Sequence, residues 1–114
     1  DEEIAALAAR SLPGVTPVTC DLFDEAAFAG LLQCQRAAEI LVLDPPRDGL
    51  KCRSGLFGRH SRLREVLYIS CDLATFTRDL RDFLAAGYQL EEVQPVDLFP
   101  QTPHVELLAH LRRP

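Results

Sequence analysis

A chain of 114 residues has room for one domain, and its apolar fraction of 47% is normal for a globular protein. The net charge of −5 argues against a general polyanion-binding surface, because phosphate contacts need clustered Lys and Arg. No apolar run approaches the length of a membrane span, and the first residues lack the positive region of a signal peptide. The composition therefore predicts a soluble protein with no membrane partner.

The cysteines indicate the compartment. Cys20, Cys34, Cys52 and Cys71 are widely and unevenly spaced, without a Cys-x-x-Cys pair that would suggest zinc or an iron–sulfur cluster. A disulfide framework is also not expected without secretion signals. We therefore predict free thiols, no metal and a cytoplasmic location.

One basic cluster lies within residues 47–64. Two interpretations stay open for it, a solvated loop and a set of phosphate contacts. Its members are Arg47, Lys51, Arg53, Arg59, Arg62 and Arg64, with His60 among them.

A helix and a short strand are expected first. Residues 2–12 carry apolar side chains on one helical face, and a Pro-Gly pair ends the pattern. Residues 15–20 predict a short strand, in which Pro17 would remove a ladder hydrogen bond and so indicates an edge position. Asp21 lies just past the end of this strand.

A second helix and a buried strand follow. Asp24 is a good cap for a short helix whose apolar residues face inward. Residues 39–44 are nearly all apolar, which is typical of a parallel strand covered on both faces. Two prolines then make a rigid loop that fixes Asp44 at the carboxyl end of the strand. A short polar helix is expected at about 59–64.

The stretch around Cys71 predicts a strand that leads into a helix. An apolar run ends on Cys71, Asp72 is a good N-cap, and apolar residues at helical spacing continue as far as Gly87. The positive end of the helix dipole would favour the thiolate form of this cysteine and make it a better nucleophile. The alternative is a small core residue at the end of a strand.

Residues 88–96 and 104–111 predict two strands joined closely enough for an antiparallel hairpin. The whole order is that of an open α/β sheet, in which ligands collect at the carboxyl ends of the parallel strands. Asp21, Asp44 and Cys71 are all expected at such ends.

Glu106 completes the set of candidate reactive groups. It stands near the start of the last strand and shares a face with Leu108, so we expect it to be partly buried. A carboxylate in that setting suits a base that takes a proton near neutral pH. The alternative is a salt bridge to an arginine of the basic cluster.

Three segments together resemble the S-adenosylmethionine-dependent RNA uracil-5 methyltransferases, which make 5-methyluridine in tRNA and rRNA. They are LDPPRDG at 43–49, YISCDLAT at 68–75 continuing to RDL at 78–80, and PVDLFPQTPHVE at 95–106. The resemblance extends over the whole chain. It departs from the family at Asp72 and Leu73, where the family has Asn and Pro.

The resemblance implies a role for each candidate residue. In this family a cysteine thiolate attacks carbon 6 of uracil, so that carbon 5 can accept the methyl group. Cys71 holds that position, and Glu106 matches the base that removes the carbon 5 proton. Asp44, with Pro45 and Arg47 in the same motif, is implied to contact the uracil or the cofactor. Asp21 is similar to the residue that faces the adenine of S-adenosylmethionine.

The resemblance also implies a Rossmann-like class I methyltransferase sheet that is incomplete here and ends in an antiparallel hairpin. The first two strands, with the Gly-rich cofactor turn, and the RNA-binding region are expected before residue 1. Residues 1–114 would then be the carboxyl-terminal portion of a catalytic domain, inactive alone. In that case we expect residues 15–20 to pair directly with residues 39–44 through a right-handed crossover, or a neighbouring chain to fill the gap.

Two other functions stay open at this point. An RNA cytosine-5 methyltransferase also uses a cysteine at carbon 6, but the loop after residues 39–44 has no Pro-Cys pair. A catalytically silent α/β module that binds RNA or a partner is the other alternative. The oligomeric state cannot be predicted from the sequence.

Overall fold

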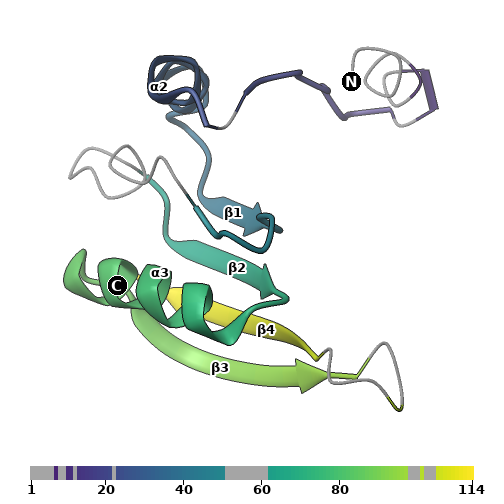
Figure 1. The fold of residues 1–114 in the computed structure, drawn as a ribbon. Helices are drawn as coiled ribbons and strands as arrows, with labels where there is room; N and C mark the ends of the chain where they lie inside the picture. Colours follow the sequence, from purple (N-terminus) through teal and green to yellow (C-terminus); the bar gives the residue numbers. More distant parts are fainter. Residues whose placement is uncertain are drawn as a thin grey trace.

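The computed structural model describes residues 7, 10–11, 13–21, 23–50, 62–97, 101 and 105–114. Its principal elements are one helix, two strands, a second helix and two further strands (Figure 1). In chain order they are α2 (Glu25–Cys34), β1 (Ile40–Leu43), β2 (Glu65–Ser70), α3 (Leu73–Ala85), β3 (Gln89–Val96) and β4 (Glu106–Arg112). In the described part of the chain, no helix is both long and apolar enough to cross a membrane.

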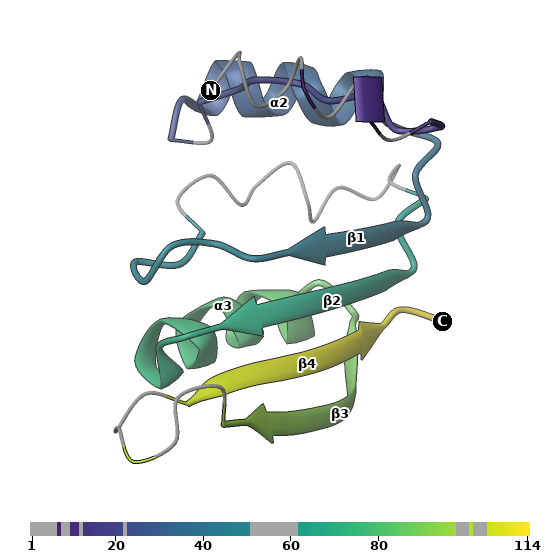
Figure 2. The ribbon, with the colours of Figure 1, turned by 90° about the vertical axis from the view of Figure 1, so that its right-hand side faces the viewer.

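The four strands form one mixed sheet in the order β1-β2-β4-β3. β1 and β2 run parallel, whereas β4 is antiparallel to both β2 and β3. The chain therefore leaves β3 at the edge of the sheet and returns as β4 between β3 and β2 (Figure 2). The predicted α/β class and the terminal antiparallel hairpin are confirmed.

Helix α3 covers one face of the sheet and supplies much of the core. Its ends are as predicted, because Asp72 is the N-cap and Gly87, at a φ of 99°, follows the C-cap. The rings of Phe76 and Phe83 meet Tyr68 of β2 edge-on, at centroid distances of 5.5 and 6.5 Å. Phe83 and Tyr68 are almost completely buried, so these contacts fix the helix on the sheet.

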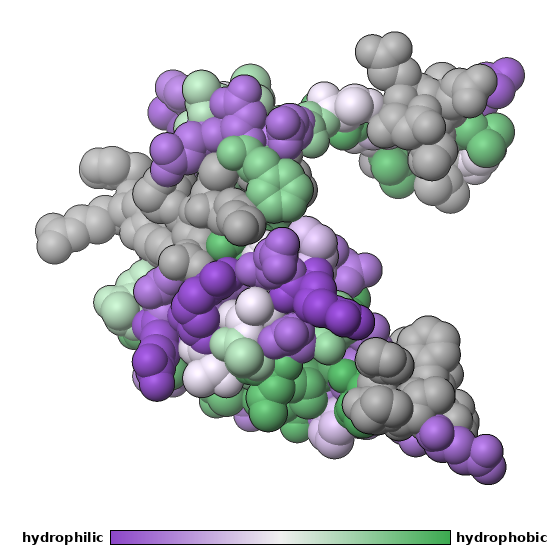
Figure 3. Space-filling model, viewed as in Figure 1, coloured by the Kyte–Doolittle hydropathy of each residue, from purple (hydrophilic) through white to green (hydrophobic). Residues whose placement is uncertain are grey.

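Exposed apolar side chains remain away from this core. Ile40 and Val42 of β1 alternate with the half-buried residues of that strand and are exposed. Figure 3 shows hydrophilic side chains gathered over α3 and a hydrophobic patch beneath them over β3, where Leu90 and Val93 are exposed. Both outer strands of the sheet therefore present apolar surface.

Residues 15–20 do not form the predicted strand. They are extended but belong to no strand of the described sheet, and they run away from it in Figure 1. The predicted direct pairing with residues 39–44 is wrong, since β1 has β2 as its partner in the sheet and lies at its edge. Pro17 cannot donate to a ladder, and the exposed Val15 and Val18 bury too little surface to hold the segment there.

Two predicted helices are revised. Residues 62–64 are not helical, because the Arg64 N–H donates to the Glu39 carbonyl at 2.8 Å and the backbone already runs toward β2. The rest of that predicted helix lies outside the described residues. Of residues 2–12, the described residues 7, 10 and 11 are helical and the others lie outside the description.

Tyr88 makes folding stability depend on alkaline pH. Its hydroxyl donates to the Leu63 carbonyl at 3.1 Å, and its ring packs edge-on against Phe83. Burial raises the pKa of Tyr88 above its usual value of 10.0, and the nearby charge of Arg113 partly lowers it again. The folded form thus holds this proton more tightly than the unfolded chain does.

This stability is therefore fully present below about pH 10 and is lost as the pH rises toward the folded-state pKa. We expect the free energy of unfolding, measured by urea titration from about pH 8 to about pH 11, to fall less steeply in Tyr88→Phe than in the unaltered protein. Equal slopes would show that Tyr88 does not couple folding to pH.

Candidate active site at the carboxyl ends of the parallel strands

Asp44 and Cys71 lie at the same edge of the sheet. Asp44 directly follows β1, and Cys71 directly follows β2. Because the two strands are parallel, with Leu43 level with Tyr68, their carboxyl ends point the same way (Figure 2). Both residues are exposed. The sequence prediction of their positions is confirmed.

Glu106 reaches this edge from the opposite direction. It is the first residue of β4, whose antiparallel ladder with β2 ends at the pair Ser70 and Leu107. Extended by one residue, this register brings Cys71 opposite Glu106, and paired residues in such ladders have Cα atoms about 5 Å apart. Glu106 is half-buried, as predicted. Three neighbouring strands thus carry two carboxylates and a thiol to one edge.

The backbone around Cys71 is held by its neighbours. The Ser70 hydroxyl is buried, accepts from the Asp72 N–H at 3.1 Å and donates to the Asp72 carbonyl at 2.9 Å. The Asp72 carboxylate accepts from the Thr75 N–H at 3.1 Å and caps α3. Cys71 is a free thiol beside this fixed turn and remains open to solvent.

The loop after β1 carries the other residues of the DPPR motif. Pro45 is half-buried and Arg47 is exposed, and the Gly49 N–H donates to the Pro46 carbonyl at 2.8 Å to close a turn. Gly49 has a φ of 77°, which a residue with a side chain rarely adopts. The motif is thus a compact turn that begins at the site.

Asp21 is not positioned as predicted. It does not follow a strand, because residues 15–20 join no strand of the described sheet. Its carboxylate accepts from the Phe23 N–H at 3.0 Å, and its carbonyl accepts from the Asp24 N–H at 3.1 Å. Asp21 therefore organises the approach to α2 and, unlike Asp44, is not brought to the edge by a strand.

Sequence reasoning missed a buried polar group beneath this edge. Asp79 of α3 is fully buried, and its Oδ2 accepts from the Tyr68 hydroxyl at 2.6 Å and the Leu50 N–H at 3.0 Å. Its spacing from Phe76 and Phe83 places it on the apolar face of the helix. A charged residue on that face was the available signal.

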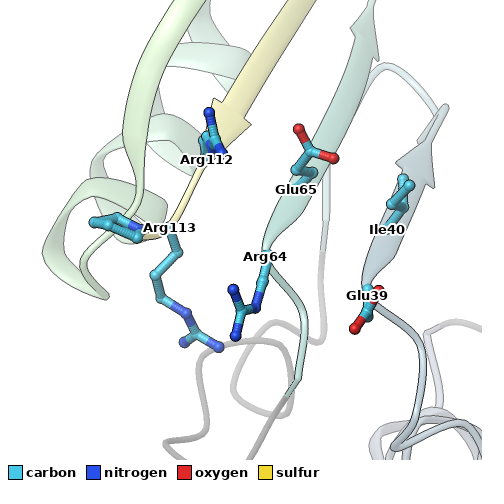
Figure 4. A pocket seen from close by; sticks show the side chains of 7 residues that line it. Glu39, Ile40, Arg64, Glu65, Arg112 and Arg113 are labelled. Carbon is cyan, nitrogen blue, oxygen red and sulfur yellow. The ribbon is translucent and has the colours of Figure 1, made fainter.

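A pocket of about 190 Å³ lies at the other end of the parallel strands (Figure 4). Its lining side chains are mostly charged, and they come from the starts of β1 and β2 and the end of β4. They are Glu39, Ile40, Arg64, Glu65, Arg112, Arg113 and Pro114. This pocket is therefore separate from the edge that carries Cys71. Nowhere in the described ranges do three or more potential metal ligands gather.

These features define an α/β protein whose reactive side chains lie where open α/β sheets bind their ligands. Residues 28–113 match the family described as tRNA (Uracil-5-)-methyltransferase. The chain belongs to that family.

Individual relatives agree. The chain is 43% identical over 108 residues to an uncharacterized RNA methyltransferase of Nitrosomonas europaea, which covers 95% of the chain and 28% of the relative. It is 40% identical over 113 residues to the 23S rRNA (uracil(1939)-C(5))-methyltransferase of Halomonas elongata, covering 99% of the chain and 23% of the relative.

A solved structure is also similar. It is the Pyrococcus abyssi tRNA (uracil-54, C5)-methyltransferase in complex with S-adenosyl-L-homocysteine, with a TM-score of 0.54 and 36% identity. The match covers 64% of this chain and 18% of that one. The chain thus spans less than a third of the length of these relatives.

Proposed function

We propose that the protein containing this chain transfers a methyl group from S-adenosylmethionine to carbon 5 of a uracil base in tRNA or rRNA. The observation that supports this most is the approach of Cys71 and Glu106 to one edge of the sheet from neighbouring strands. Family membership supplies the reaction class. The free thiols of Cys20, Cys34 and Cys71 agree with a reducing, cytoplasmic setting.

The exposed groups at this edge fit the proposed ligands chemically. The Asp44 carboxylate only accepts hydrogen bonds, so it can pair with the single ring N–H that uracil keeps available in RNA. Asp21 would accept from the amino group of adenine. Pro45 offers a partly buried apolar surface, and Arg47 a cation for a phosphate. When bound, S-adenosylmethionine supplies an electrophilic methyl group.

Cys71 would begin the reaction. Its thiolate sulfur forms a bond to carbon 6 of uracil, and the electron pair of the ring double bond moves to give an enolate that is nucleophilic at carbon 5. Carbon 5 then takes the methyl group. The base is now saturated at both carbons and covalently held by the protein.

Glu106 would complete it. Its carboxylate removes the remaining proton from carbon 5, the carbon–carbon double bond reforms, and the bond from sulfur to carbon 6 breaks. The thiolate of Cys71 leaves as it entered. The register of β2 and β4 supports this sequence, because sulfur and base would act on adjacent atoms of one ring.

The test is the chemical identity of the product. The full-length protein is incubated with S-adenosylmethionine and unmodified tRNA or rRNA, and the RNA is digested to nucleosides for mass spectrometry. We expect 5-methyluridine. Formation of 5-methylcytidine instead would assign the protein to cytosine, and RNA binding without any methylated nucleoside would identify a silent binding module.

A further inference from the structure

The loop that carries Asp44 is held by one face of the helix that begins beside Cys71. Thr75, Arg78 and Asp79 of α3 contact four successive residues of the loop, 47–50. A single rigid element therefore touches both halves of the candidate site.

Arg78 makes the widest set of these contacts. Its Nη2 donates to the Asp48 carbonyl at 2.8 Å and to the Leu50 carbonyl at 3.4 Å. The same guanidinium donates to Asp79 Oδ1 through Nε at 3.2 Å and Nη2 at 3.1 Å. A planar group with several donors can fix a loop and a carboxylate at once, which a point charge cannot do.

Asp79 extends this network into the core. While Oδ1 faces Arg78, Oδ2 accepts from the Leu50 N–H and from the Tyr68 hydroxyl. Tyr68 belongs to β2, which ends beside Cys71. Because Asp79 and Tyr68 are almost fully buried, their geometry is set by packing rather than by solvent.

The space around the loop leaves no room for displacement. A Cβ at Gly49 would lie 2.6 Å from Arg78 Nη2 and 2.7 Å from Asp79 Oδ2. The Thr75 hydroxyl donates to the Arg47 carbonyl at 2.9 Å on the same side of the turn. The loop backbone thus lies directly against the helix side chains.

We propose that Arg78 and Asp79 are positioning residues that hold the 44–50 loop, and with it Asp44, at a fixed place relative to Cys71. This inference rests on the proposed function. Methyl transfer needs the base oriented by Asp44 to meet the sulfur at attack distance, and a misplacement of about 1 Å costs about 100-fold in rate. RNA affinity, which other regions also supply, does not depend on this distance.

The experiment uses the full-length protein with Arg78→Ala, and Arg81→Ala as the matched control from the exposed surface of the same helix. We expect Arg78→Ala to lower the single-turnover rate of methyl transfer about 10- to 100-fold at saturating RNA and cofactor. The Kd for RNA should change less than about threefold, and Arg81→Ala should behave as the unaltered protein. Arg78→Lys keeps one donor and should recover part of the rate; it also serves if Arg78→Ala does not fold.

A double-mutant cycle separates positioning from general stability. If Arg78 acts through Asp44, adding Arg78→Ala to Asp44→Ala should lower the rate by less than about threefold further. Multiplying losses, or an unaltered rate in both Arg78 variants, would overturn the inference. Absence of 5-methyluridine from the unaltered protein would instead overturn the proposed function, on which this inference rests.

Discussion

Replacing Cys71 by alanine is expected to abolish methyl transfer, lowering kcat by at least about 10³-fold. The substitution removes the atom that forms the bond to carbon 6, and without that bond carbon 5 of uracil is too weak a nucleophile to take the methyl group. Because Cys71 is exposed and lies outside both β2 and α3, the free energy of unfolding should change little. The measurement is single-turnover formation of 5-methyluridine, alongside urea unfolding.

The matched control is Cys34→Ala, which removes another exposed free thiol at the end of α2. This variant should keep the full rate. A Cys71→Ala protein that remains folded and still makes 5-methyluridine at a rate comparable to the control would rule out covalent catalysis by this residue.

Replacing Glu106 by glutamine is expected to stop the reaction after methyl transfer rather than before it. The amide cannot remove the proton from carbon 5, so the bond between Cys71 and carbon 6 cannot be eliminated. We expect kcat to fall by about 10²- to 10⁴-fold and a covalent protein–RNA complex to accumulate with ordinary uridine RNA. Denaturing gel electrophoresis with labelled RNA measures that complex directly.

Glu91→Gln is the control, since Glu91 is an exposed carboxylate of the edge strand β3. It should turn over normally and leave no complex. If Glu106→Gln also turned over at the unaltered rate, another group would have to be the base. If it lost activity without accumulating the complex, Glu106 would be needed before the methyl group is transferred.

Much of the central fold could be predicted because its signals are local. Asp24 and Asp72 cap α2 and α3 as expected, and Gly87 follows the C-cap of α3 with a positive φ. The uninterrupted apolar runs of β1 and β2 identified a parallel pair, and this pairing brought Asp44 and Cys71 to one edge. Glu106 followed from the register of the final hairpin.

The failures concern partners that a local pattern does not specify. Residues 15–20 have a strand-like composition, but a strand forms only where another backbone completes its hydrogen bonds, and β1 does not do so here. Asp21 was misplaced for the same reason. In α3, Leu73 and Leu84 were expected inside but are exposed, whereas Asp79 is fully buried. Partners from β2 and the 44–50 loop make that burial possible, and helical spacing alone does not reveal them.

The most direct test of the account uses RNA that carries 5-fluorouridine. Fluorine at carbon 5 replaces the proton that the base must remove, so the adduct on carbon 6 cannot be eliminated after methyl transfer. The full-length protein is incubated with this RNA and S-adenosylmethionine, digested, and the nucleotide-bearing peptide is sequenced by mass spectrometry. The account predicts a methylated fluorouridine nucleotide attached to Cys71, and attachment to any other residue would contradict it.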